Sequence, residues 1–264
     1  MRGLLAGAWR FRHFIVSSVR SEFASRFARS RLGGLWMILN PLAQAAMFAF
    51  VLSTVLAARL PGVDSRYGFA LFLMAGLLAW SLFQETVNRC LSVFIDNGNL
   101  LKKMVFPRIC LPLVVAGSAL VSNLLLLAAT FAVFALLGEL PGVHALWLPL
   151  LVVLTLALSL GLGLVLGVLN VFLRDIGQVM PIVMQFAFWF TPIVYAPSLI
   201  PDRIRPLLAL NPMYPVVTAY QDVLVYGRAP QLGSLAVVAV VAAVLLGFAL
   251  FLFRRASAEM VDAL

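Results

Sequence analysis

The chain has 264 residues, of which 63% are hydrophobic and only 11% are charged. Soluble domains carry roughly 25% charged residues, so this composition excludes an ordinary water-soluble fold and predicts an all-α integral membrane protein. The net charge of +9 does not indicate nucleic-acid binding, because the Lys and Arg residues lie in short segments between apolar runs rather than in one basic domain. That distribution is typical of membrane topology.

Residues 1–34 form the first predicted region, which is too basic to cross a membrane. Within it an apolar side chain recurs every four positions, with Arg residues between. On a helix this spacing gives an apolar stripe flanked by cations, which predicts an amphipathic helix lying in the plane of the lipid headgroups. The alternative is a plain basic anchor for the first span. The stripe consists of Phe11, Ile15, Val19, Phe23 and Phe27.

Residues 35–264 are predicted to form one transmembrane domain. A span needs about 20 apolar residues to cross a hydrocarbon core of about 30 Å, and richness in Leu, Ala and Phe without strand-like alternation favours helices over a barrel. Most basic residues fall in segments on the same side as the N-terminus, so both termini are predicted to be cytoplasmic. The six predicted spans cover residues 35–58, 69–87, 111–137, 146–169, 180–195 and 234–253.

The segment 196–233, between the fifth and sixth spans, contains six Pro residues and cannot be one long helix. It is nevertheless mostly apolar at 204–210 and 216–226, and both pieces are short for a full span. These features predict two short helices that re-enter the outer half of the membrane and line a pathway there. A purely structural extracellular cap is the alternative.

A short connection from Asp96 to Arg108 follows the second span. Asp and Asn residues suit the start of a helix, Pro107 suits its end, and apolar residues lie around the Lys pair. This pattern predicts a short amphipathic helix at the cytoplasmic surface that fits the groove of a soluble partner. An ordinary basic loop that fixes topology is the alternative.

The fourth span contains Gly163 and Gly167, a GxxxG pair that predicts close packing of two helix backbones, within one chain or between two. The span ends at Arg174 and Asp175, which either pair locally or anchor a partner.

Aromatic side chains concentrate in the fifth span, between Pro181 and Pro192 and just beyond. Aromatic rings offer flat apolar faces to sugars without placing charge in the bilayer, so they are candidates for a substrate path. Packing or lipid-facing aromatics near an interface belt are the alternative. The candidates for the path are Phe186, Trp189, Phe190 and Tyr195.

The sequence contains no G-x-x-x-x-G-K-[ST] phosphate loop, so the chain is not an ATPase of that type. Glu85 is the clearest ionisable residue in the spans, which gives no proton or ion relay. The two Cys and two His residues lack the spacing of a metal site, so no metal ligand and no catalytic residue is assigned. The energy source is therefore predicted to be another polypeptide.

An ordered set of short motifs resembles the membrane subunit of bacterial ABC-2-type polysaccharide exporters, which move O-antigens, teichoic acids and related glycans. The motifs extend over most of the chain in the order that this family shows. They are Ser30–Trp36, Asn40–Pro41, Leu101–Lys103, Phe106–Arg108, Phe172–Asp175, Thr191–Ile193, Asn211–Pro212 and Tyr220.

The resemblance implies a homodimeric channel in the bacterial inner membrane, bound to two copies of a cytoplasmic subunit that holds ATP and magnesium. The cargo would be a polyprenyl-diphosphate-linked glycan, and the Pro-rich segment would form gate helices. The implied ATPase-coupling helix comprises Asn97, Asn99, Leu100, Leu101, Lys102, Lys103 and Phe106. Cationic side chains would attract the anionic headgroup at the inner interface; they are Arg26, Arg29 and Arg31.

Two other functions remain open at this point. The first is an ABC-2 permease for a small hydrophobic drug or lipid, with the same fold and partner. The second is a membrane assembly factor that transports nothing.

Overall fold

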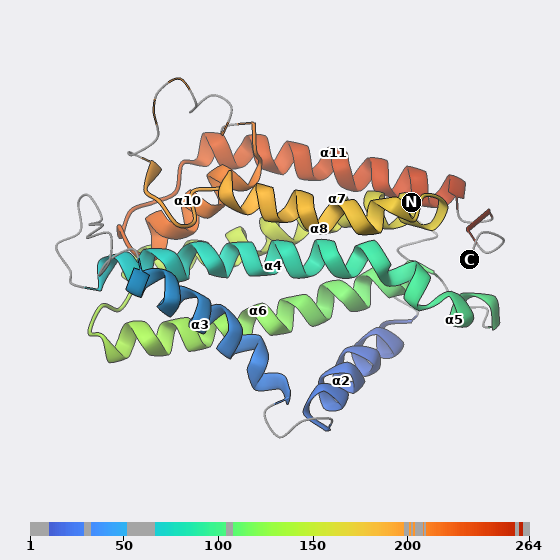
Figure 1. Ribbon diagram of the computed structural model, residues 1–264, viewed down its shortest axis with the longest axis horizontal. Coiled ribbons are helices and arrows are strands. Elements are labelled where there is room, and N and C mark those ends of the chain that lie inside the picture. Colours follow the sequence, from blue (N-terminus) through green and yellow to red (C-terminus); the bar gives the residue numbers. More distant parts are fainter. Residues whose placement is uncertain are drawn as a thin grey trace.

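The computed structural model describes residues 11–28, 33–51, 67–103, 108–197, 201, 203, 208, 210–256 and 259–260. Every element of secondary structure assigned within these ranges is a helix, which confirms the all-α fold class. They form an elongated bundle (Figure 1). Four of them are long and apolar enough to cross a membrane: α4 (Gly68–Asp96), α6 (Cys110–Leu136), α7 (Leu148–Phe172) with the preceding turn η3 (Val143–Trp147), and α11 (Leu232–Ala256).

The long helices follow from runs of Leu, Val and Ala without helix-breaking residues in their interiors. The 25 residues of α7 contain no ionisable side chain and span about 38 Å at 1.5 Å per residue. α6 ends in a Schellman motif, in which Glu139 N donates to Phe134 O and Gly138 N to Ala135 O. Gly138 takes a φ of +77°, which glycine adopts without steric cost.

α4 is the central helix of the bundle, and 78% of its most apolar window is buried. It packs against α7, α6, α10 (Met213–Leu224) and α3 (Trp36–Phe50), while α7 also packs against α11. The predicted GxxxG contact lies inside one chain. A Cβ atom on Gly163 would lie 2.7 Å from Cys90 Cβ, and one on Gly167 would overlap the Cys90 carbonyl oxygen. The absence of side chains there brings α7 directly onto α4.

The first and fifth predicted spans correspond to shorter helices. α3 and α8 (Asp175–Trp189) have 15 residues each, less than the roughly 20 needed to cross the hydrocarbon core without thinning or tilt. α3 ends at Phe50 and is followed by Val51, and residues 52–66 lie outside the described ranges. α8 begins before the predicted residue 180 and stops before 195, because Pro192 cannot continue the hydrogen-bond ladder of the helix.

The second predicted span also differs at its end, since α4 continues to Asp96 rather than stopping at residue 87. The apolar run ends near Glu85, but the helix continues beyond it. Glu85 and Arg89 lie one turn apart and form an ion pair, with 3.4 Å between Oε1 and Nη1, which satisfies both charges within the helix.

The predicted N-terminal helix is present as α2 (Arg12–Ala28), which lies beside α6 near α5 (Gly98–Lys103) in Figure 1. The turn η1 (Gly33–Leu35) leads into α3. Four members of the predicted apolar stripe are half-buried: Phe11, just before α2, and Ile15, Val19 and Phe23 on it. The side chain of the fifth, Phe27, lies outside the described part of the chain. Val19 lies over Gly117 of α6. The stripe therefore packs against protein, and its placement in the headgroup plane stays a prediction.

Candidate functional site

One end of the bundle brings together the ends of α4, α7 and α11, the start of α6 and the short helix α5 (Figure 1). Buried apolar side chains from the ends of α4, α7 and α11 and from the start of α6 form one hydrophobic cluster there, separate from the main core. The cluster includes Phe94, Leu101, Leu111, Val171 and Phe253. α5 is thus packed directly against the ends of the long helices.

α5 has six residues and follows α4 after one intervening residue, Asn97. The Asn97 side chain donates to Val93 O at 2.8 Å, and the backbone carbonyl of Asn97 accepts from Leu101 N at 3.0 Å. Leu101 is buried in the end cluster, whereas Asn99 and Lys102 are exposed. α5 thus has one anchored side and one outward polar side.

The structure describes the remaining residues of the predicted coupling surface only in part. Leu100 is half-buried and packs against the end cluster. The side chain of Lys103 and the whole of Phe106 lie outside the described part of the chain. The short helix itself was predicted from the sequence over residues 97–106; α5 covers residues 98–103 of that range, and residues 104–107 lie outside the described part of the chain.

A polar network connects α2, α4 and α6 next to α5. Arg89 Nη2 on α4 donates to Glu22 Oε2 on α2 at 2.7 Å, and Ser118 Oγ on α6 donates to the same oxygen at 2.7 Å. Arg89 also bonds Glu85, which accepts from Ser122 Oγ at 3.4 Å. Both side chains of the Arg89–Glu22 pair are about one-quarter exposed (24% and 25%), so the pair contributes about 1 kcal/mol.

This network lies against a second feature of the same end, a cavity of about 280 Å³. α2, α4, α5 and the start of α6 all contribute to its lining, which includes Glu22, Arg89, Asn97 and Leu100. α2 is therefore linked through Arg89 to the helix that leads into α5. Glu85 is recognisable from the sequence as an ionisable residue within a span, whereas Glu22 and Arg89 belong to none of the predicted sites. The i,i+4 spacing of Glu85 and Arg89 indicates their pairing, whereas the partner on α2 depends on tertiary docking.

The turn from α7 into α8 lies at the same end and carries Arg174 and Asp175. Both residues are exposed, and α8 begins at Asp175. The turn is held by buried Asn170, whose Nδ2 donates to Leu91 O on α4 and whose Oδ1 accepts from Gly177 N, each at 2.8 Å. Asn170 thus fixes the turn, while Arg174 and Asp175 point to solvent, where a partner can reach them.

The aromatic side chains of the predicted fifth span include an exposed set and a buried residue. Phe186, Trp189 and Phe190 expose 63%, 53% and 55% of their surface, whereas Phe188 is buried against Trp80 with ring centroids 5.7 Å apart. Tyr195 is half-buried, and its hydroxyl donates to Trp189 O at 2.9 Å. The exposed set presents an aromatic surface on the outside of a single chain, and Phe188 holds α8 in place.

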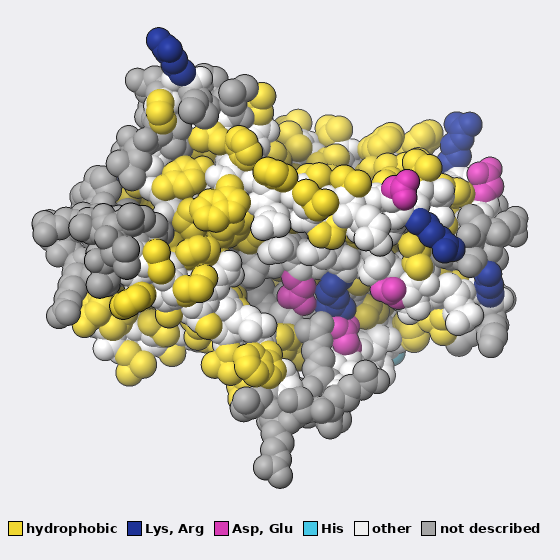
Figure 2. Space-filling view, in the orientation of Figure 1, with side chains coloured by type: hydrophobic (Ala, Val, Ile, Leu, Met, Phe, Trp, Pro, Cys, Tyr) yellow, Lys and Arg dark blue, Asp and Glu magenta, His cyan; other side chains and the backbone are white. Residues whose placement is uncertain are grey.

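On the face drawn in Figure 2, hydrophobic and charged side chains gather toward opposite ends of the bundle. Hydrophobic side chains cover the half away from α5, and most of the visible charged side chains lie toward α5. The predicted headgroup residues add nothing to this pattern, because Arg29 and Arg31 and the side chain of Arg26 lie outside the described part of the chain. No cluster of His, Cys, Asp or Glu that could hold a metal ion occurs among the described residues.

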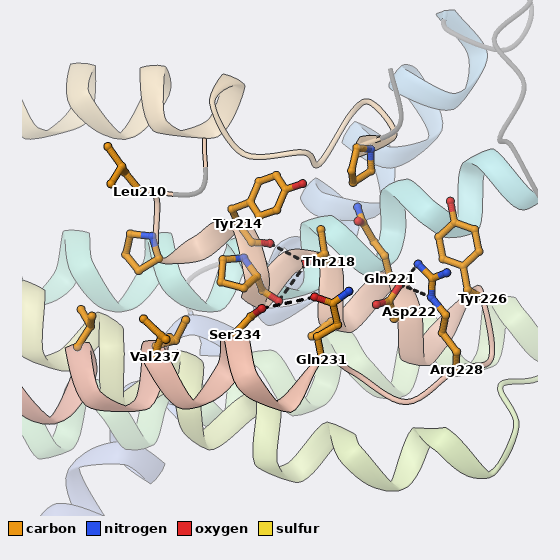
Figure 3. Close-up of a pocket in the computed structure, with 16 residues that line it drawn as sticks. Leu210, Tyr214, Thr218, Gln221, Asp222, Tyr226, Arg228, Gln231, Ser234 and Val237 are labelled. Atoms are coloured by element: carbon orange, nitrogen blue, oxygen red, sulfur yellow. Dashed lines mark hydrogen bonds and ion pairs between the residues drawn. The ribbon is translucent and has the colours of Figure 1, made fainter. Parts of the chain in front are cut away.

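The opposite end contains a cavity of about 590 Å³ between α10 and the start of α11 (Figure 3). Buried Gln221 donates to Pro192 O at 2.8 Å, which ties α10 to the turn after α8. Arg228 Nη2 lies 2.7 Å from Asp222 Oδ1 and forms an ion pair. Burial raises the pKa of Tyr226 despite the opposing effect of Arg228, so this hydroxyl stays protonated.

This geometry agrees with what comparison with known proteins finds. The profile of a family described as "ABC-2 type transporter" matches residues 14–225, so the chain belongs to that family of transporters. With four long apolar helices, it is a multi-pass inner-membrane protein. The predicted family and location are confirmed.

Individual relatives carry more specific names. The chain is 29% identical to "O-antigen export system permease protein RfbA" of Myxococcus xanthus, over 99% of both proteins. A protein of the same name from Klebsiella pneumoniae is 27% identical over 81% of this chain and 80% of its own length. "Polysialic acid transport protein KpsM" of Escherichia coli is 26% identical over 90% of this chain and 92% of its own length.

Proposed function

We propose that this chain is the permease subunit of an ATP-driven exporter that moves a lipid-linked polysaccharide across the inner membrane. The observation that carries the proposal is the match along nearly the whole chain to permeases named for export of O-antigen and polysialic acid. The chain has no phosphate loop, so ATP and magnesium belong to a separate cytoplasmic subunit. The chain itself supplies the conduit and catalyses no reaction.

We infer six spans with both termini cytoplasmic, including the two 15-residue helices. α7 and α11 both end in the cluster beside α5, so the chain must return to the other end between them, and α8 is the helix placed to do so. α3 likewise takes the chain from the α5 end, where α2 lies, to the other end, where α4 begins. Each helix is about 22 Å long at 1.5 Å per residue, and local thinning of the bilayer accommodates such lengths.

α10 has 12 residues, about 18 Å, which is too short to cross the core. Asn211 Nδ2 donates to Thr191 Oγ1 at 2.8 Å and Gln221 bonds Pro192 O, so α10 is tied to the end of α8. We assign α10 as one of the two short gate helices. Most of the other predicted helix, around residues 204–210, lies outside the described ranges.

We further propose that two copies of the chain assemble and that each binds one ATPase subunit through α5. The anchored Leu101 and the exposed Asn99 and Lys102 support this role, because a partner can grip the polar side while the apolar side transmits the motion. The exposed rings of Phe186, Trp189 and Phe190 would line the conduit between the copies. Arg26, Arg29 and Arg31 would attract the diphosphate of the polyprenyl carrier at the inner surface.

The test is a gene deletion complemented with the wild-type chain. Loss of surface glycan with accumulation of its lipid-linked precursor, both restored by the wild-type gene, is expected. A change in sensitivity to hydrophobic drugs with normal surface glycan would identify a drug or lipid permease instead. Failure of any ATPase to co-purify with the chain, with all export intact in the deletion strain, would leave only an assembly role.

A further inference from the structure

The cavity between α10 and α11 is polar at one end and apolar at the other. Thr218 and Asp222 of α10 and Gln231 and Ser234 at the start of α11 form the polar end (Figure 3). Farther along α11 the lining changes to Val residues, ending at Val241. From Gln231 to Val241 the helical rise covers about 15 Å. An occupant that fills this volume needs a polar group at one end and hydrocarbon at the other.

The apolar end of the cavity is continuous with an exposed apolar face of α11. Val237 lines the cavity and is 64% exposed, and Val240 and Val244 on the same side of the helix are equally exposed. Only 22% of the apolar window of α11 is buried. If this face borders the lipid hydrocarbon, a chain from the bilayer reaches the cavity without crossing polar surface.

The charges at the polar end are opposite and adjacent. Nε of Arg228 donates to Asp222 Oδ1 at 2.8 Å, and Nη2 reaches the same oxygen at 2.7 Å. These two bonds use part of the five N–H donors of a guanidinium group. The Arg228 side chain is 64% exposed, and its guanidinium lies 4.7 Å from the centre of the Tyr226 ring. The pair carries no net charge, which suits a headgroup that carries one charge of each sign.

We propose that this cavity binds a membrane phospholipid with a zwitterionic, ammonium-bearing headgroup such as phosphatidylethanolamine. The phosphodiester accepts hydrogen bonds from Arg228, the ammonium group donates to Asp222, and one acyl chain lies along Val237 and Val241. A lipid diphosphate fits less well, because its second negative charge meets the carboxylate of Asp222. The proposal depends on the membrane location of the chain and not on the identity of its cargo.

The test measures lipid binding to the full chain, purified in detergent and stripped of lipid, by native mass spectrometry. Palmitoyl-oleoyl phosphatidylethanolamine and the corresponding phosphatidylglycerol are titrated in parallel. The wild type is expected to bind the ethanolamine lipid more tightly. Val237→Trp fills the apolar end of the cavity and should weaken that binding about tenfold, because it displaces part of the acyl chain from its apolar contacts. Val240→Trp is the matched control, since Val240 is equally exposed but outside the lining.

A second variant keeps the fold while changing the recognition. Asp222 accepts the backbone N–H of Arg228 through its own carbonyl at 3.0 Å, and Asp222→Asn retains this bond and a side-chain acceptor. It should abolish the preference for the ethanolamine lipid, because the ammonium group loses its carboxylate partner while the anionic phosphatidylglycerol no longer meets a negative charge and binds more tightly. Equal losses in Val237→Trp and Val240→Trp would overturn the proposal. So would an unchanged preference in Asp222→Asn, or displacement of the phospholipid by polyprenyl phosphate or by a soluble oligosaccharide.

Discussion

At the scale of single residues, the bond between Glu22 and Arg89 holds α2 against the bundle beside α5. Glu22→Gln removes the charge that Arg89 and Ser118 share. The expected cost is about 1 kcal/mol, which raises the detached population of α2 about fivefold. Trypsin cleavage at exposed Arg20 follows that population when opening is fast, so the cleavage rate in inverted vesicles should rise by the same factor.

The control for this prediction is Glu139→Gln. Glu139 is an exposed carboxylate just after α6, outside the polar network. Its substitution should leave the cleavage rate unchanged. An equal increase in both variants would mean that net charge, rather than the bond to Arg89, controls α2.

The contact between α7 and α4 gives a second residue-scale prediction. A Cβ atom on Gly167 overlaps the Cys90 carbonyl oxygen, which is backbone and cannot rotate away, whereas a Cβ atom on Gly247 of α11 meets nothing within 4 Å. Gly167→Ala should therefore destabilise the protein by about 2 kcal/mol or more. Gly247→Ala should be neutral or slightly stabilising, since alanine favours a helix by about 1 kcal/mol over glycine.

Thermal unfolding of the two variants in the same detergent checks this prediction. The melting temperature should fall by several degrees for Gly167→Ala only. Similar melting temperatures would show that α7 and α4 can separate at no cost, contrary to the close contact at Cys90.

Whether a contact between residues can be predicted from the sequence depends on how close its two residues lie along the chain. The Gly163 and Gly167 pair was recognised because its spacing alone defines one helix face, although the sequence left open which helix it meets. The bond of Glu22 to Arg89 was missed because it joins residues 67 positions apart. Pairing at such a separation follows from how α2 docks on α6, which no local pattern encodes.

At the scale of elements, α5 is the helix whose exposed side is available to a partner. Asn99→Ala combined with Lys102→Glu changes only exposed residues, so the fold and membrane level should be unaffected. If the ATPase docks here, the amount that co-purifies should fall about tenfold, as expected for loss of one charge-assisted contact with its hydrogen bonds.

Arg255→Glu reverses an exposed charge on α11 at the same end of the bundle. It is the control for general electrostatic attraction, and matching losses in both variants would argue against docking on α5.

The boundaries of the elements were less predictable than their existence. Hydropathy located the four long helices, but it ended the second one at residue 87, because charged residues lower the local mean although the Glu85–Arg89 pair keeps the helix intact. Hydropathy also extended the fifth span to 195, since Ile193 and Val194 are apolar, whereas Pro192 ends the ladder earlier. Apolarity and hydrogen-bonding capacity are separate properties, and a span requires both.

At the scale of the whole molecule, the two ends of the bundle have different chemistry. The α5 end combines an apolar cluster, the Glu22–Arg89 network and an outward polar helix side. The other end combines α10, which is too short to span, with an amphipathic cavity. α4 touches α5, α7 and α10, so motion received at α5 would reach the other end through this helix. α4 thus connects the proposed ATPase surface to the proposed gate.

The topology that this coupling requires can be tested with single cysteines. Lys102 and Arg174 are exposed at the α5 end, and Leu210, after α8, is 80% exposed. The native cysteines, Cys90 and Cys110, are buried and should react little with a membrane-impermeant maleimide.

In cells with only the outer membrane permeabilised, Leu210→Cys should be labelled at once. Lys102→Cys and Arg174→Cys should require rupture of the inner membrane, because α8 lies between Arg174 and Leu210. Labelling of Arg174→Cys and Leu210→Cys from the same side would show that α8 does not cross. In that case α11 would start on the cytoplasmic side, which is incompatible with its end lying beside α5 in the same cluster as the end of α7.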